Sequence, residues 1–169
     1  MANRLWNQEE KVEVVFDSPS EVGCKYRYLL KCKWSDDLPK VTFVMLNPSV
    51  ANASICDPTL SRCVSFAKNW GYGGINVVNL FAYISTDPAN LKSISDPVGK
   101  LNDSYIIEAV EDSELIIYAW GTKYGKIQKR DRKVISLLLD YDPQCIKKKK
   151  NGDPSHPLYL SENLMPIAY

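Results

Sequence analysis

The sequence predicts an α/β fold of three layers, in which helices cover both faces of a mostly parallel, four-stranded central sheet. Three short apolar runs, at residues 41–46, 75–80 and 115–120, end in turn signals and indicate strands buried on both faces. Segments with helical spacing lie between these runs. This alternation of strand and helix is typical of a parallel sheet.

The N-terminal part predicts one more β-element before the central sheet. Residues 25–34 (KYRYLLKCKW) alternate apolar and polar residues partly at period two, which indicates a half-exposed strand. We therefore expect an N-terminal edge strand or hairpin beside the parallel strands.

Between the first two apolar runs, the sequence predicts a helix from Asp57 to Gly71. Asp57 is a good N-cap, and Pro58 suits the first turn, where its missing N–H costs nothing. Gly71 suits the end of the helix. Residues 86–100, which are rich in Pro, Asp and Ser, predict a long loop.

The C-terminal half continues the alternation. Residues 102–112 predict a helix, residues 125–139 a basic amphipathic helix, and residues 144–148 a short fourth strand. The 169 residues are 45% hydrophobic and 24% charged, which is typical of one globular domain. We therefore expect a single α/β domain over residues 1–169.

The composition argues against several classes of protein. No apolar run reaches the length of a membrane span and the start has no signal-peptide stretch, so we expect a cytoplasmic protein without a membrane partner. Five cysteines without a Cys-x-x-Cys pair, with one histidine, predict free thiols and no metal. No glycine-rich phosphate loop follows a strand, which argues against dinucleotide oxidoreductases, ATPases and kinases, and we expect no cofactor. The oligomeric state stays open.

The net charge of +1 conceals a basic region. Residues 121–156 contain ten basic and four acidic residues, a local charge of +6. Such an excess can hold a polyanion such as nucleic acid, although a solvated helix face with a lysine-rich loop has the same composition. The candidate phosphate contacts are Lys126, Lys129, Arg130, Lys148 and Lys149.

Polar residues follow the predicted strands. Right-handed crossovers place the carboxyl ends of parallel strands at one edge of the sheet, where ligands bind in such folds. This rule predicts that four segments meet there: Asn47-Pro48-Ser49, Asn79-Leu80-Phe81, Trp120-Gly121-Thr122 and His156-Pro157.

Each of these residues also has a structural explanation. Asn47 can orient water or grip a base, but Asn before Pro also begins a turn. Asn79 needs a polar partner inside an apolar strand, and this partner can be backbone or ligand. His156 can stabilise an oxyanion or be a satisfied loop residue, and Phe81 and Trp120 can stack on bases or complete the core.

Longer strings of the sequence resemble a family of uncharacterised bacterial and phage proteins. This resemblance covers residues 26–160 and implies no activity. The strings are Met45-Leu46-Asn47-Pro48-Ser49, Asp57-Pro58-Thr59, Trp70-Gly71-Tyr72, Asn79-Leu80-Phe81-Ala82-Tyr83, Asp96-Pro97-Val98-Gly99, Trp120-Gly121 and His156-Pro157-Leu158-Tyr159.

The strand-end motifs also resemble, in the same order, four motifs of the uracil-DNA glycosylase superfamily. Asn47-Pro48 is similar to the motif that orients the attacking water, and Asn79 is similar to the Asn that reads the flipped base. Trp120-Gly121 and His156-Pro157-Leu158 resemble the last two motifs, of which the second carries the His that stabilises the departing base. The resemblance implies a uracil-DNA glycosylase-like fold. Ser49 and Tyr159 depart from the residues usual at their positions.

These patterns lead to a functional hypothesis. The protein is expected to act on a nucleobase, in nucleic acid or in a free nucleotide, as a glycosylase-like hydrolase that cleaves or exchanges an N-glycosidic bond. Asn47 would place the nucleophile and His156 would stabilise the leaving group. The expected substrate-binding residues are Pro48, Ser49, Asn79, Phe81, Trp120 and Gly121. The alternatives are a non-catalytic module that binds nucleotide or nucleic acid, and an interaction protein whose strand-end motifs are only turns and core.

Overall fold

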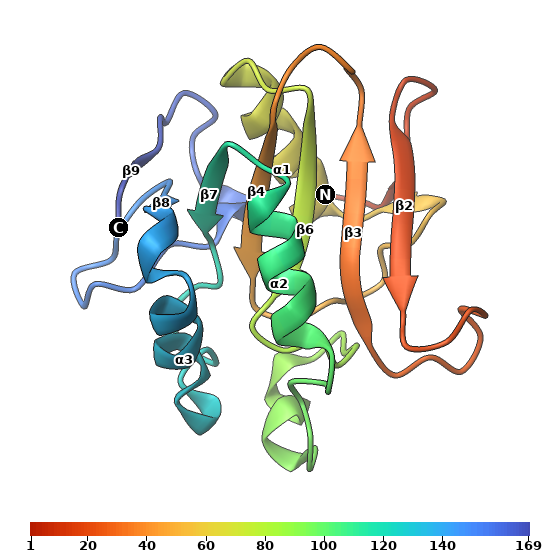
Figure 1. The fold of residues 1–169 in the computed structure, drawn as a ribbon, viewed down its shortest axis with the longest axis vertical. Helices are drawn as coiled ribbons and strands as arrows, with labels where there is room; N and C mark the ends of the chain where they lie inside the picture. The colour runs from red at the N-terminus through yellow and green to blue at the C-terminus, as the bar shows by residue number, and fades with distance from the viewer.

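The computed structural model describes all residues, Met1–Tyr169, and has one seven-stranded sheet at its centre (Figure 1). The strands lie in the order β2-β3-β6-β4-β7-β8-β9. Their bounds are β2 Lys11–Phe16, β3 Arg27–Lys33, β4 Lys40–Met45, β6 Gly74–Asn79, β7 Leu115–Tyr118, β8 Gln144–Cys145 and β9 Ile167–Ala168.

The sheet is mixed, so the expectation of a mostly parallel, four-stranded sheet is corrected. Strand β4 pairs in parallel with β6 and β7, and β7 pairs in parallel with β8. Antiparallel pairings then add β3 and β2 on one side and β9 on the other. The antiparallel pair of β2 and β3, with β2 at the edge, agrees with the expected N-terminal edge strand or hairpin, although the residues of β2 were not predicted. The sequence rules missed β9, which has only two exposed residues.

Helices cover both faces of the sheet, as the sequence predicted (Figure 1). Helix α1 (Pro58–Asn69) packs on one face through Leu60, Cys63 and Phe66. Helices α2 (Asn102–Glu111) and α3 (Arg130–Leu137) pack on the other. Because side chains alternate along a strand, β4 contributes Phe43 to the first core and Val44 to the second.

Helix α1 has the ends that the sequence predicted. Asp57 is extended and accepts the Leu60 N–H at 2.8 Å, and Pro58 occupies the first turn. Beyond the last helical residue, Gly71 has a φ of +85°, and the Tyr72 N–H returns to the Ala67 carbonyl at 2.9 Å. This left-handed position is the reason that a glycine stands there.

Strand β3 is more buried than its sequence pattern predicted. Its first four residues are all buried, and Leu29 and Leu30 face opposite cores. The strand is not at the edge, because β2 pairs with one side of it and β6 with the other. The charged residues in β3 made it look half-exposed.

The basic helix predicted over residues 125–139 is shorter than expected. Gln128 and Lys129 have φ values of 54° and 55°, in the left-handed region, and α3 begins only at Arg130. The Arg130 Nε donates to the Leu80 carbonyl at 2.7 Å, and its guanidinium pairs with Asp103. These buried contacts of Arg130 fix the start of the helix. Apolar periodicity in the sequence does not reveal such contacts.

The remaining elements are short. A separate two-stranded ribbon joins β1 (Arg4–Leu5) to β5 (Ile55–Cys56). The loop predicted over residues 86–100 contains a 3₁₀ turn, η1 (Pro88–Ser93), and further 3₁₀ turns are η2 Ile127–Lys129, η3 Leu139–Tyr141 and η4 Pro157–Tyr159. None of the helices has the length and apolar character needed to cross a bilayer.

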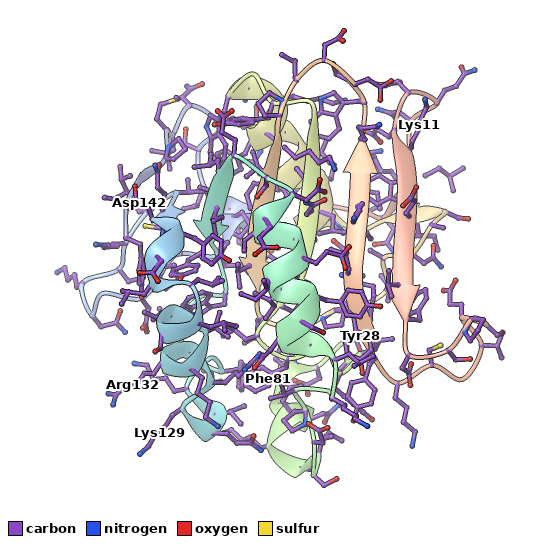
Figure 2. The ribbon with its side chains drawn as sticks, viewed as in Figure 1. Lys11, Tyr28, Phe81, Lys129, Arg132 and Asp142 are labelled. Atoms are coloured by element: carbon purple, nitrogen blue, oxygen red, sulfur yellow. The ribbon has the colours of Figure 1, made fainter.

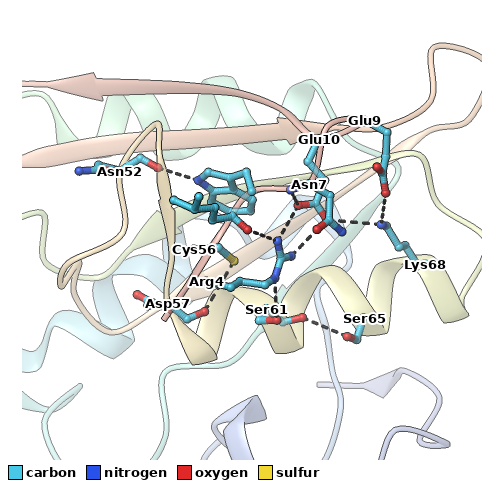
Figure 3. A network of polar contacts seen from close by, with 12 residues as sticks. Arg4, Asn7, Glu9, Glu10, Asn52, Cys56, Asp57, Ser61, Ser65 and Lys68 are labelled. Atoms are coloured by element: carbon cyan, nitrogen blue, oxygen red, sulfur yellow. Dashed lines mark hydrogen bonds and ion pairs between the residues drawn. The ribbon is translucent and has the colours of Figure 1, made fainter. Parts of the chain in front are cut away.

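A buried carboxylate holds the N-terminal segment against α1 (Figure 3). The side chain of Glu10 is fully buried and accepts hydrogen bonds from Arg4 at 2.8 and 3.1 Å and from the Asn7 N–H at 2.8 Å. Lys68 of α1 lies 3.4 Å away, and Arg4 also reaches Ser61 at 3.3 Å. Burial raises the pKa of Glu10, but the hydrogen bonds from Arg4 and Asn7 outweigh it and hold this pKa below its ordinary value.

We expect Glu10→Gln to lower the free energy of unfolding by about 1–3 kcal/mol at pH 7, because it weakens a buried, charge-assisted network. The stabilisation by Glu10 is present above its unfolded pKa of 4.5 and is lost as the pH falls through the lower folded value. Urea unfolding at pH 7 and pH 3.5 measures both effects. The matched control is Glu9→Gln, because Glu9 is exposed and should contribute less than about 0.5 kcal/mol. Equal losses in the two variants would contradict the prediction.

Candidate functional site

A cavity of about 280 Å³ lies at the carboxyl ends of β4 and β6, next to the first turn of α1. Its lining includes Asn47, Asn79 and His156, which the strand-end rule predicted to meet. The turn after His156 packs against α1, which brings this distant loop to the sheet. The structure thus brings three of the sequence-predicted residues together, and their roles remain predictions.

Asn47 closes a turn, which is one of the two explanations that its sequence context left open. Its Nδ2 donates to the Pro48 carbonyl at 3.0 Å and to the Ser85 carbonyl at 2.9 Å, so the side chain closes a turn. Pro48 is buried, and its carbonyl also accepts the Ser85 N–H at 3.0 Å. These bonds occupy the amide donors of Asn47 and leave its Oδ1 as the atom that can accept from a ligand. Ser49 lines the cavity beside this turn.

Asn79 is the last residue of β6 and is 1% exposed. Its backbone carbonyl accepts from Asn102 at 2.9 Å, but its side-chain Nδ2 has no hydrogen-bond partner in the chain. A buried amide without a partner costs about 1–3 kcal/mol, so such groups usually have a ligand or a water. Asn79 therefore presents an unused donor in the cavity lining.

His156 also has a structural role and a remaining free group. Its Nδ1 accepts the Leu158 N–H at 3.3 Å, so the neutral ring carries its proton on Nε2. Burial lowers the pKa of His156 below 6.5, and the Asp57 carboxylate partly offsets this effect. The ring is therefore neutral at pH 7 and has one N–H to donate.

Sequence reasoning missed two charged residues of the cavity, Arg27 and Asp57. Arg27 is the first residue of β3. Because β3 runs antiparallel to β6, the start of β3 lies at the edge where β6 ends. The strand-end rule considered only carboxyl ends and so overlooked this position. The sequence did offer one signal for a buried charge, because Arg27 stands directly before the apolar residues of the predicted strand.

Arg27 is 3% exposed and makes few hydrogen bonds. Its Nη1 donates to the Ala51 carbonyl at 2.7 Å, whereas its buried Nε has no partner. Burial lowers the pKa of Arg27 to about 10, and Asp57 partly offsets the shift. Asp57 was predicted only as an N-cap. Its cavity position follows from α1, which begins at the edge where β4 ends.

Phe81 and Trp120 do not line the cavity. Both belong to the core beneath α2 and α3, and the Trp120 ring lies 4.5 Å from that of Tyr118. Tyr118 and Trp120 therefore share the sheet face opposite to α1, which removes both predicted stacking residues from the cavity lining. Gly121 lies closer to the site, because a Cβ built on it would be 3.7 Å from the His156 Cβ.

The five basic residues predicted to contact phosphate have different environments. Arg130 is buried and paired with Asp103, so it cannot reach a polyanion, and this expectation is corrected. Lys126 pairs with Asp153 at 3.4 Å, and Lys148 donates to the Tyr169 carbonyl at 2.9 Å.

Lys129 and Lys149 are exposed. Figure 2 shows Lys129 and Arg132 extending from the α3 region into solvent. Lys126 and Lys129 line a second depression, which shares no residue with the cavity. No group of three or more His, Cys, Asp or Glu side chains is arranged to hold a metal ion.

Comparison with known proteins agrees with the family resemblance that the longer sequence strings indicated. Residues 27–158 match the family described as "Protein of unknown function (DUF1643)". The match covers most of the chain, so the protein belongs to this family. No curated protein and no solved structure matches the chain.

We expect the stability of the protein to depend on His156 between pH 7.5 and pH 5. The folded pKa of this residue is below its unfolded value of 6.5, so the unfolded state binds more protons as the pH falls and stability decreases. The melting temperature of the wild type should therefore fall across this window. His156→Gln should flatten the curve, because His156 is the only histidine. Parallel curves for the two proteins would show that His156 is not buried in its neutral form.

Proposed function

We propose that the protein is an enzyme that acts on a nucleobase or nucleotide by cleaving or exchanging an N-glycosidic bond. The observation that carries this proposal is the meeting of Asn47, Asn79 and His156, from three separate segments, in the lining of one cavity. Each has an amide or imidazole group that its structural hydrogen bonds leave free. A planar heterocycle with polar edges is a ligand that such groups recognise.

The unpaired groups of Asn47, Asn79 and His156 suggest a separate role for each residue. Asn79 would bind the edge of the base, and the neutral His156 would donate a hydrogen bond from its Nε2–H to the departing base, which leaves as an anion. Asn47 Oδ1 would hold the attacking water or acceptor. The C1′–N bond breaks with its electron pair on the base, and the nucleophile oxygen bonds to C1′. Asp57, the one carboxylate in the lining, would stabilise the positive sugar and take the proton of the nucleophile.

The resemblance to the uracil-DNA glycosylase superfamily supports the same chemistry. Its first, second and last motifs correspond to Asn47, Asn79 and His156, the residues that line the cavity. The third motif contributes Gly121 beside His156. The buried Trp120 offers no stacking surface there, so recognition would rest on polar groups.

The size of the cavity suits a small substrate. Its volume of about 280 Å³ is just below the range of ordinary ligand sites, about 300–1,000 Å³. A nucleic-acid substrate would have to insert one nucleotide and place its phosphates outside, near exposed Lys129 or Lys149. A non-catalytic module that binds the same ligand is the alternative, because Asn47 already serves a structural role.

We expect release of free base from at least one member of a panel of nucleosides, nucleotides and modified oligonucleotides. Asn47→Ala and His156→Ala should each lower the rate by about 10²–10³-fold, because each removes a polar group that acts on the transition state. Chromatography of the released base measures the rate.

The control is Lys11→Ala. Lys11 is exposed and lies at the opposite end of the sheet from Phe81, which follows the cavity end of β6 (Figure 2). Its substitution should therefore leave the rate unchanged. If folded wild-type protein binds panel members but releases no base from any of them, the enzyme proposal is wrong and the protein is a non-catalytic binding module.

A further inference from the structure

The Arg27 guanidinium is a buried charge without a carboxylate partner. Three other arginines are paired: Arg4 with Glu10, Arg62 with Glu162 and Arg130 with Asp103. Arg130 is a direct comparison, because it and Arg27 are both 3% exposed. Arg27 forms none of the ion pairs in the chain.

Such an arrangement is costly in the free protein. A buried cation is normally stabilised by an anion together with further hydrogen bonds. Arg27 has one hydrogen bond, from Nη1 to the Ala51 carbonyl, and its buried Nε has no acceptor. Arg27 lines the cavity, so a ligand in the cavity can supply the missing acceptors. Arginine favours oxyanions, because its planar nitrogens match two oxygens of a phosphate or carboxylate.

Neighbouring groups add further donors. The Asn79 Nδ2 is also buried without a partner, and neutral His156 keeps its Nε2 proton. The Ser49 and Thr59 hydroxyls line the same cavity. Asp57 is the one opposing charge, and it is not within ion-pair distance of Arg27. Arg27 and Asp57 are the two charged side chains of the lining, so an anion would be held by the donors that face it and not by a net positive charge of the cavity.

The burial of Arg27 also restricts the form of the anion. An internal phosphodiester continues on both sides, so its two ester arms would need room beside the strand ends. A terminal group needs room on one side only. We propose that Arg27 binds a terminal oxyanion of the ligand, a phosphate monoester or a carboxylate, so that the substrate is a small anionic nucleotide or base rather than a base within a polymer. The nucleotide part of this inference rests on the proposed function.

Calorimetry and thermal shift with wild type, Arg27→Met and Arg27→Lys test the inference. The probes are inorganic phosphate, nucleoside 5′- and 3′-monophosphates, the matching nucleosides, orotate as a base carboxylate, and short oligonucleotides. Wild type should bind one anionic probe at least about 30-fold more tightly than its uncharged counterpart, uracil in the case of orotate. Arg27→Met should remove this preference. Arg27→Lys should keep only part of it, because a lysine lacks the planar pair of donors.

The control is Arg132→Met, which removes an exposed arginine that does not line the cavity and should keep the preference. Preference for monophosphates or for orotate identifies which oxyanion Arg27 binds. Equal affinity for charged and uncharged probes, or a preference that survives in folded Arg27→Met, would overturn the inference.

The two proposals can fail separately. Binding of monophosphates through Arg27 without release of base would reject the glycosidic reaction and keep the oxyanion site. Release of base from nucleosides and oligonucleotides, with no preference for a terminal phosphate, would keep the reaction and reject the oxyanion site.

Discussion

The parallel pairing of β4 with β6 is the constraint on which the cavity depends. It places Met45 opposite Asn79, so that the two strands end at the same level. The chain leaves β4 through the Asn47 turn and returns through α1, which therefore begins at this edge with Asp57. One antiparallel neighbour, β3, begins where these strands end and adds Arg27. The charged and amide groups of the cavity thus follow from strand direction.

Strand direction also explains what the sequence could predict. Apolar runs and the Asp-Pro helix start indicated β4, α1, β6 and β7, because burial and capping are local chemistry. The order of these elements then placed Asn47, Asn79 and His156 at one edge. The sequence predicted a strand over residues 25–34 and an N-terminal edge strand or hairpin, but it did not reveal β9 or that β3 lies between β2 and β6, because pairing partners are not encoded in the pattern of a single strand.

The residues that were placed wrongly depend on tertiary contacts that the sequence pattern does not show. Arg130 was assigned to a solvent-exposed helix face, but a carbonyl of the Asn79-Leu80 segment and Asp103 together compensate its burial. Trp120 follows a strand of the correct edge, but the side that it faces depends on the alternation of side chains and not on position in the chain. Arg27 was overlooked for the opposite reason, because a charge in a strand looks exposed until both neighbouring strands are known.

The two hydrogen bonds that the Asn47 amide donates to carbonyl oxygens restrict which side chain this position accepts. An aspartate at this position would direct a carboxylate at the Pro48 and Ser85 carbonyls, which offer no proton, and like partial charges would open the turn. The turn therefore keeps an amide, and any acidic function must come from another backbone position. Asp57 is the carboxylate of the cavity lining, and its Oδ1 accepts the Leu60 N–H at the start of α1, where the helix dipole favours negative charge. The position of the carboxylate in this cavity is therefore tied to the start of α1, and it cannot be moved without reshaping that helix start.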